Sequence, residues 1–135
     1  MLFRSDIYTM HLHYKAHEAM EKMDSEKLTK FLEFRIKFLQ EELDELKNAN
    51  GPEDVVDALI DLCVVAIGTL DAYNVDAYKA WNAVFEANMN KEVGVKESRP
   101  NPLGLPDLIK PVGWVAPSHW DNHGDLVDVN FRANP

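Results

Sequence analysis

The chain has 135 residues, a length typical of a single domain, and 46% of them are hydrophobic. Its formal net charge of −9 at pH 7 argues against a surface that binds nucleic acid or an anionic membrane. The only cysteine, Cys63, excludes a disulfide framework and lies in an apolar run, so we expect a core residue of a cytoplasmic protein. We also expect neither a signal peptide nor a segment that spans a bilayer.

Four segments before residue 93 are expected to be helices. In the first two, residues 6–23 and 25–49, apolar side chains recur at helical spacing. Asp24 lies between them and is a typical N-cap residue. The run Asn50-Gly51-Pro52 is a strong stop signal for the second helix.

The third and fourth expected helices span residues 53–73 and 77–91. The third is nearly uncharged from Leu62 to Leu70, which predicts a central position among the helices. Asp76 is the expected N-cap of the fourth helix.

Residues 93–135 are rich in proline and glycine, and we expect an irregular tail without convincing strands. Trp114, Val115 and Trp120 should hold this tail against the helical body, which covers about residues 6–92. The sequence therefore predicts one all-α domain, 1–135, with a four-helix bundle. Few helices are left to cover the central one, which predicts a homodimer or a dimer of dimers.

Carboxylates recur where these helices should be apolar. In the second helix, Glu42 and Glu45 lie on or beside the apolar stripe, and Glu41 is one turn before Glu45. Asp57 and Asp61 share one face of the third helix, and Asp61 is flanked by apolar residues. Buried carboxylates are costly unless they are paired or bind a metal ion.

Three interpretations of these carboxylates are open. Charged runs on helices are often solvated faces, and paired carboxylates also serve as acid and base in glycoside hydrolysis. Glycoside hydrolysis needs two carboxyl groups on either side of a cleft, not five that converge. Converging carboxylates instead favour a site for Mg²⁺ or Mn²⁺, because these hard cations prefer oxygen ligands.

The same residues resemble the MazG-like, all-α nucleoside triphosphate pyrophosphohydrolase superfamily, which includes phosphoribosyl-ATP pyrophosphohydrolase. Its EExxE motif is similar to Glu41, Glu42 and Glu45, and the aspartate of its second motif is similar to Asp61. The glutamate expected three residues before that aspartate is Ala58 here, and Asp57 is a geometric substitute. Residues 87–91 resemble the end of the family's fourth helix, and Lys-Pro-Val-Gly-Trp at 110–114 resembles the tail of the phage-type branch.

The resemblance implies hydrolysis of a nucleoside triphosphate between the α and β phosphates. It implies two or three Mg²⁺ or Mn²⁺ ions per site, held by Glu41, Glu42, Glu45, Asp57 and Asp61, which would neutralise the phosphates and activate water. We expect Glu41 and Glu42 to be the catalytic residues, with Glu41 orienting or deprotonating the water. Expected substrate contacts are Asn88, Lys91, Lys79, Arg35 and, from its place in the first helix, His11.

The substrate stays open at this point. A purine triphosphate such as dGTP is one expectation, phosphoribosyl-ATP is the alternative, and Ala58 also permits a catalytically silent nucleotide-binding dimer. Of His11, His13 and His17, only His13 and His17 share a helix face, and we expect no soft-metal site there.

Overall fold

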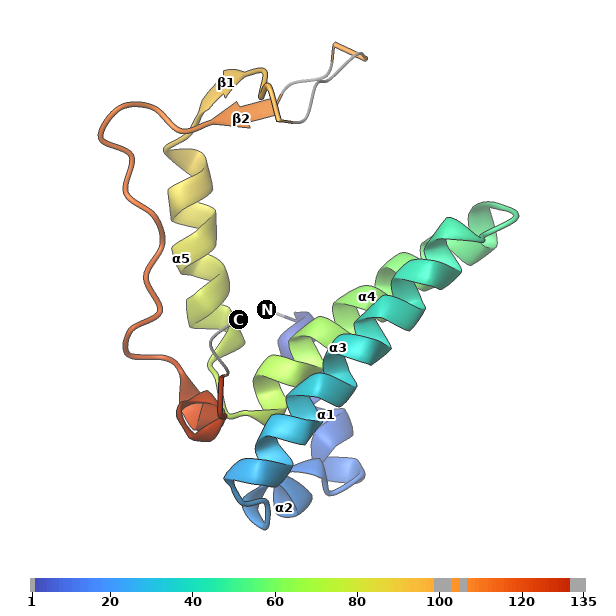
Figure 1. The fold of residues 1–135 in the computed structure, drawn as a ribbon. Helices are drawn as coiled ribbons and strands as arrows, with labels where there is room; N and C mark the ends of the chain where they lie inside the picture. The colour runs from blue at the N-terminus through green and yellow to red at the C-terminus, as the bar shows by residue number, and fades with distance from the viewer. Residues whose placement is uncertain (1, 99–102, 105–106, 132–135) are drawn as a thin grey trace. The chain divides into compact units, whose positions relative to one another are not determined.

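The computed structural model describes residues 2–98, 103–104 and 107–131, which form two compact units (Figure 1). The first unit spans Met1–Ala77 and Asn122–Pro135, and the second spans Tyr78–Asp121. The described residues form five α-helices, one 3₁₀ helix and one two-stranded sheet, so the all-α prediction is confirmed. Residues 99–102, 105–106 and 132–135 of the expected tail lie outside the described part.

Four helices build the first unit: α1 (Leu2–His13), α2 (Ala16–Glu21), α3 (Ser25–Lys47) and α4 (Pro52–Ala72). Helices α3 and α4 form a long antiparallel hairpin (Figure 1). Helices α1 and α2 also pack on α4. Helix α4 is therefore central within this unit, as predicted. Cys63, however, is exposed on α4, so its expected place in the core is wrong.

Local signals set the bounds of the hairpin. The Asp24 side chain accepts a hydrogen bond of 2.9 Å from the backbone N–H of Lys27 and caps α3. Gly51 and Pro52 begin α4, and proline is well suited to a first helical position because its missing N–H has no helical partner there. Both helices begin and end within two residues of the predicted bounds.

The first expected helix, 6–23, is wrong in two respects, because helix begins already at Leu2 and the chain breaks it into α1 and α2. Lys15 lies between them with a left-handed φ of 59°. A non-glycine residue rarely adopts this conformation, and neither glycine nor proline marks the break in the sequence. The turn changes the direction of the chain and brings α2 back against α4.

The core lies where α3 begins and α4 ends. Tyr73 is fully buried there, and its hydroxyl donates a hydrogen bond of 2.5 Å to the carbonyl of Leu28. The short 3₁₀ helix η1 (Gly124–Asp128) packs on α3 and brings Leu126 and Val129 to this core. The buried core residues are Met20, Leu28, Ala72, Tyr73, Val75 and Val129.

Of the three residues expected to hold the tail on the helical body, Trp114 does contact that body, on α5, whereas the segment after Asn122 is held by other residues. The backbone N–H of Asp125 donates a hydrogen bond of 2.7 Å to the carbonyl of Tyr73. Trp120 and Val115 are 79% and 78% exposed, so they do not anchor the tail. Trp114 packs within the second unit, where its indole N–H donates 2.7 Å to the carbonyl of Ala87.

The second unit contains α5 (Ala77–Met89) from Tyr78 onward, β1 (Glu92–Gly94) and β2 (Asp107–Ile109). The strands are antiparallel, with Glu92 opposite Ile109 and Gly94 opposite Asp107. The expectation of no strands is wrong here, because strands of three residues are too short to give an alternating pattern. No helix in the described part of the chain is long and apolar enough to cross a membrane.

Candidate metal and nucleotide site

Three carboxylates meet between the C-terminal half of α3 and the N-terminal half of α4. Glu42 and Glu45 come from α3 and Asp61 comes from α4, and one oxygen of each lies within 4.8 Å of the others. We call these three residues the acidic cluster. The antiparallel hairpin explains the meeting, because it sets the end of one helix beside the start of the next.

Glu42 is the least exposed member of the acidic cluster, at 9%. Its Oε2 atom is buried and has no hydrogen-bond partner among the described residues. Burial raises the pKa of the Glu42 carboxyl, and the neighbouring charges of Glu45, Asp61 and Asp57 raise it further. A carboxylate in this position is unfavourable unless a cation or a proton joins it.

The acidic cluster fits Mg²⁺ or Mn²⁺ by its chemistry. All of its ligand atoms are carboxylate oxygens, which hard divalent cations prefer. The buried Oε2 of Glu42 supplies a ligand atom that nothing else in the described chain satisfies. A bound cation would also reverse the electrostatic effect that raises the pKa of Glu42.

The two other predicted metal ligands, Glu41 and Asp57, are not members of the acidic cluster. Glu41 is exposed and is not one of the three converging carboxylates. Asp57 is also exposed, yet it is close enough to raise the pKa of Glu42. Asp57 also lines a surface pocket of about 300 Å³. The residues around this pocket are Glu45, Asn48, Ala49, Asp54, Asp57 and Ala58. Both residues stay predicted ligands.

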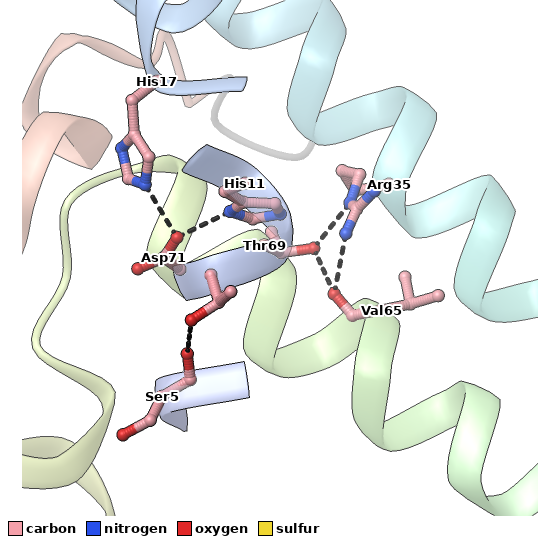
Figure 2. Close-up of polar contacts among 8 residues, drawn as sticks. Ser5, His11, His17, Arg35, Val65, Thr69 and Asp71 are labelled. Carbon is pink, nitrogen blue, oxygen red and sulfur yellow. Dashed lines mark hydrogen bonds and ion pairs between the residues drawn. The ribbon is translucent and has the colours of Figure 1, made fainter. Parts of the chain in front are cut away.

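Arg35 lies two helical turns before Glu42 and is directed at α4. Its guanidinium donates hydrogen bonds to the Thr69 hydroxyl at 2.9 Å and to the Val65 carbonyl at 3.1 Å (Figure 2). Burial lowers the pKa of this guanidinium. A contact of Arg35 with substrate phosphate stays a prediction, and it would have to use N–H donors other than the two that bind Thr69 and Val65.

Three predicted substrate contacts belong to the second unit. Asn88 and Lys79 are exposed on α5, and the Lys79 ammonium lies 2.5 Å from a carboxylate oxygen of Asp121. The Lys91 ammonium lies 5.3 Å from the centre of the Trp114 ring, an ordinary distance for a cation–π contact. These residues stay predicted substrate contacts.

His11 belongs to a group of residues that sequence reasoning missed. Its Nδ1 atom lies 2.6 Å from Oδ2 of Asp71, and Nε2 of His17 lies 2.9 Å from the same oxygen (Figure 2). In one continuous helix His11 and His17 would lie on different faces, and the break at Lys15 brings them together. The one signal for Asp71 in the sequence is a lone charge near the end of the apolar run in α4.

Comparison with known proteins now adds to this geometry. A family model described as phosphoribosyl-ATP pyrophosphohydrolase matches residues 8–88, which is more than half of the chain. The chain belongs to this family. The resemblance predicted from the acidic motifs is thereby confirmed at the level of the pyrophosphohydrolase-like superfamily. Searches of curated proteins and of solved structures gave no match.

Family membership supports a nucleotide pyrophosphohydrolase as the class of enzyme, and hydrolases of this family generally depend on divalent metal ions. The matched region contains α3, α4 and the whole acidic cluster. It ends at Asn88, before the Lys-Pro-Val-Gly-Trp segment at 110–114.

Proposed function

We propose that this protein hydrolyses a (deoxy)nucleoside triphosphate between the α and β phosphates and releases the monophosphate and pyrophosphate. The observation that carries the proposal is the buried, unpartnered oxygen of Glu42 beside Glu45 and Asp61. An acidic protein needs cations to bind a triphosphate, and this cluster offers the ligands for them. Such a reaction belongs in the cytoplasm, where nucleotides are metabolised.

Each residue of the proposed site has a role that its position supports. Glu42, Glu45 and Asp61 would hold Mg²⁺ or Mn²⁺, with Glu41 and Asp57 completing a site for two or three ions. When bound, the ions neutralise the phosphates, lower the pKa of water and stabilise the in-line transition state. Because Glu41 is exposed next to Glu42, its carboxylate can orient the attacking water or accept its proton.

Two substrates are favoured by different observations. The Lys-Pro-Val-Gly-Trp segment resembles the phage-type branch and favours a purine triphosphate such as dGTP. The matched family model instead carries the name of phosphoribosyl-ATP pyrophosphohydrolase. We propose the nucleoside triphosphate as the main substrate, with Asn88, Lys91, Lys79, Arg35 and His11 as its predicted contacts.

The test is a panel of common NTPs and dNTPs with phosphoribosyl-ATP, incubated with the protein and Mg²⁺, with products identified by phosphorus NMR. Monophosphate and pyrophosphate from a nucleoside triphosphate would support the proposal. The relative hydrolysis rates of the different nucleotides would then identify the preferred base. Turnover of phosphoribosyl-ATP alone would favour the second substrate. Diphosphate and phosphate would reject α–β cleavage, and no turnover at all would favour a silent nucleotide-binding module.

We also propose that the active form is a homodimer or a dimer of dimers. Large apolar side chains are exposed on the hairpin, including Phe34 on α3 at 59% and Val56 and Ile60 on α4 at 61% and 52%. Exposed apolar surface on this scale is typical of a face that a partner covers. Light scattering after gel filtration tests this, and a monomeric mass in the active fraction would contradict it.

A further inference from the structure

We propose that His11, His17 and Asp71 form a second metal site, suited to a borderline transition-metal ion such as Zn²⁺. The two histidine nitrogens converge on one carboxylate oxygen, at 2.6 and 2.9 Å (Figure 2). The three side chains come from three different helices, α1, α2 and α4, and one ligand atom of each lies within 4.8 Å of the others.

The backbone holds these side chains in place at some conformational cost. Lys15 adopts a left-handed φ of 59° between His11 and His17, and such strained residues are common beside ligand sites. Gly68 of α4 lies under the His11 ring, and a Cβ atom at position 68 would lie 3.6 Å from Nε2 of His11. The Nδ1 atom of His11 faces Asp71.

The donor set decides the class of metal. Two imidazole nitrogens with one carboxylate are typical ligands of Zn²⁺ and similar ions, whereas Mg²⁺ prefers oxygen ligands alone. Tetrahedral bonds of about 2.0–2.1 Å set ligand atoms about 3.3 Å apart. The separations from Asp71 to His11 and to His17 are shorter than this by less than about 1 Å. Small side-chain movements would therefore exchange the hydrogen bonds for coordination, with any proton on the ligating nitrogen either moved to the other ring nitrogen through solvent or released on metal binding.

The degree of burial suits a site that keeps contact with solvent. The side chains of His11, His17 and Asp71 are 17%, 21% and 13% exposed. Three protein ligands leave a position of a tetrahedral ion for water or another small ligand. The site is also separate from the acidic cluster, since Asp61 and Asp71 are ten residues apart on α4, about 15 Å along the helix axis.

The test uses the full chain after treatment with EDTA, with Co²⁺ as a spectroscopic probe. Glu42→Gln serves as the background, because it weakens the acidic cluster and leaves the histidines intact. We expect one equivalent of Co²⁺ to bind with a visible absorption band. In this background, His17→Ala should raise the Kd for Co²⁺ by more than the roughly 10–100-fold that follows loss of an outer-shell partner.

His13→Ala is the matched control, since His13 is exposed on α1, makes an edge-to-face contact with the Tyr14 ring and is not a member of the His11, His17 and Asp71 group. It should bind Co²⁺ as tightly as the background protein. A second measurement avoids substitutions altogether: in the wild-type protein, Zn²⁺ should shift the imidazole NMR signals of His11 and His17 and leave those of His13 unchanged. Equal Co²⁺ binding with and without His17 would overturn the proposal, and so would unchanged imidazole NMR signals on addition of Zn²⁺. Either result would mean that the three side chains form only a structural hydrogen-bond network.

Discussion

The α3–α4 hairpin is closely packed where α3 begins and α4 ends, and it is open where α3 ends and α4 begins. At the packed end, Tyr73 is fully buried and its hydroxyl donates a hydrogen bond to the carbonyl of Leu28. At the open end, Glu42 has a buried oxygen without a partner in the described chain. Large apolar side chains such as Val56 stand exposed there.

Along this one pair of helices, the residues that stabilise the fold therefore lie at one end and the residues of the proposed active site lie at the other. At the packed end the buried hydroxyl of Tyr73 is satisfied within the chain, so changes to the core around Tyr73 should alter folding. The buried carboxylate of the acidic cluster is unfavourable without a cation or a proton, so changes there should alter the proposed metal binding and turnover. Each prediction below tests whether the two ends differ in this way.

The largest effect is expected for Glu42→Gln. The amide keeps the shape of the side chain and removes the negative charge that a cation needs. Since a bound cation contributes several kcal/mol to the transition state, turnover should fall by about 100-fold or more. Steady-state rates of pyrophosphate release measure this, and the melting temperature without metal should not fall. Wild-type turnover by this variant would exclude the acidic cluster as the active site.

The aspartates of α4 should differ from each other. Asp61 converges with Glu42 and Glu45, whereas Asp57 is exposed and is not a member of the acidic cluster. We therefore expect Asp61→Asn to lower turnover by about 10–100-fold and Asp57→Asn to lower it less. Parallel rate measurements at saturating Mg²⁺ decide between them. The reverse order would give Asp57 the role that the motif assigns to Asp61.

At the packed end, Gly124→Ala should destabilise the fold. Gly124 has a φ of 51°, and a Cβ atom there would lie 2.1 Å from the carbonyl oxygen of Tyr73. Strain of this kind costs about 1–3 kcal/mol, measurable by urea unfolding. Gly51→Ala is the matched control, because φ is −170° and a Cβ atom meets nothing within 4 Å. Equal stability of the two variants would show that η1 is not fixed against Tyr73.

The smallest effect concerns pH. Because the pKa of Glu42 is raised above its ordinary value of 4.5, the folded protein holds this proton more tightly than the unfolded chain. Without metal, Glu42 therefore destabilises the protein increasingly as pH rises above 4.5. Glu42→Gln removes this contribution, so in EDTA the variant should melt higher than wild type at pH 7, and the difference should shrink towards pH 4.5. A pH-independent difference would contradict the electrostatic account.

The sequence predicted the regular parts of this fold well. The Asp24 cap, the Gly51-Pro52 start and the apolar repeats placed α3 and α4 within two residues. The acidic motifs predicted that Glu42, Glu45 and Asp61 would meet, since helical spacing and a short loop are enough to bring them together.

Features that depend on tertiary contacts were not predictable. Lys15 carries no turn signal, so the break after α1 and the meeting of His11 with His17 were missed. The strands β1 and β2 are too short for an alternating pattern. The anchoring of the C-terminal segment depends on Leu126 and Val129, two ordinary apolar residues, instead of the more conspicuous Trp120.

The most direct test of the account is the binding of Mn²⁺ to the acidic cluster. Titration of the wild-type protein and of Glu42→Gln can be followed by the electron paramagnetic resonance signal of free Mn²⁺. We predict that the wild-type protein removes Mn²⁺ from solution and that Glu42→Gln removes much less, while both remain folded. Equal uptake by the two proteins would show that the unpartnered oxygen of Glu42 is not a metal ligand and would contradict the account.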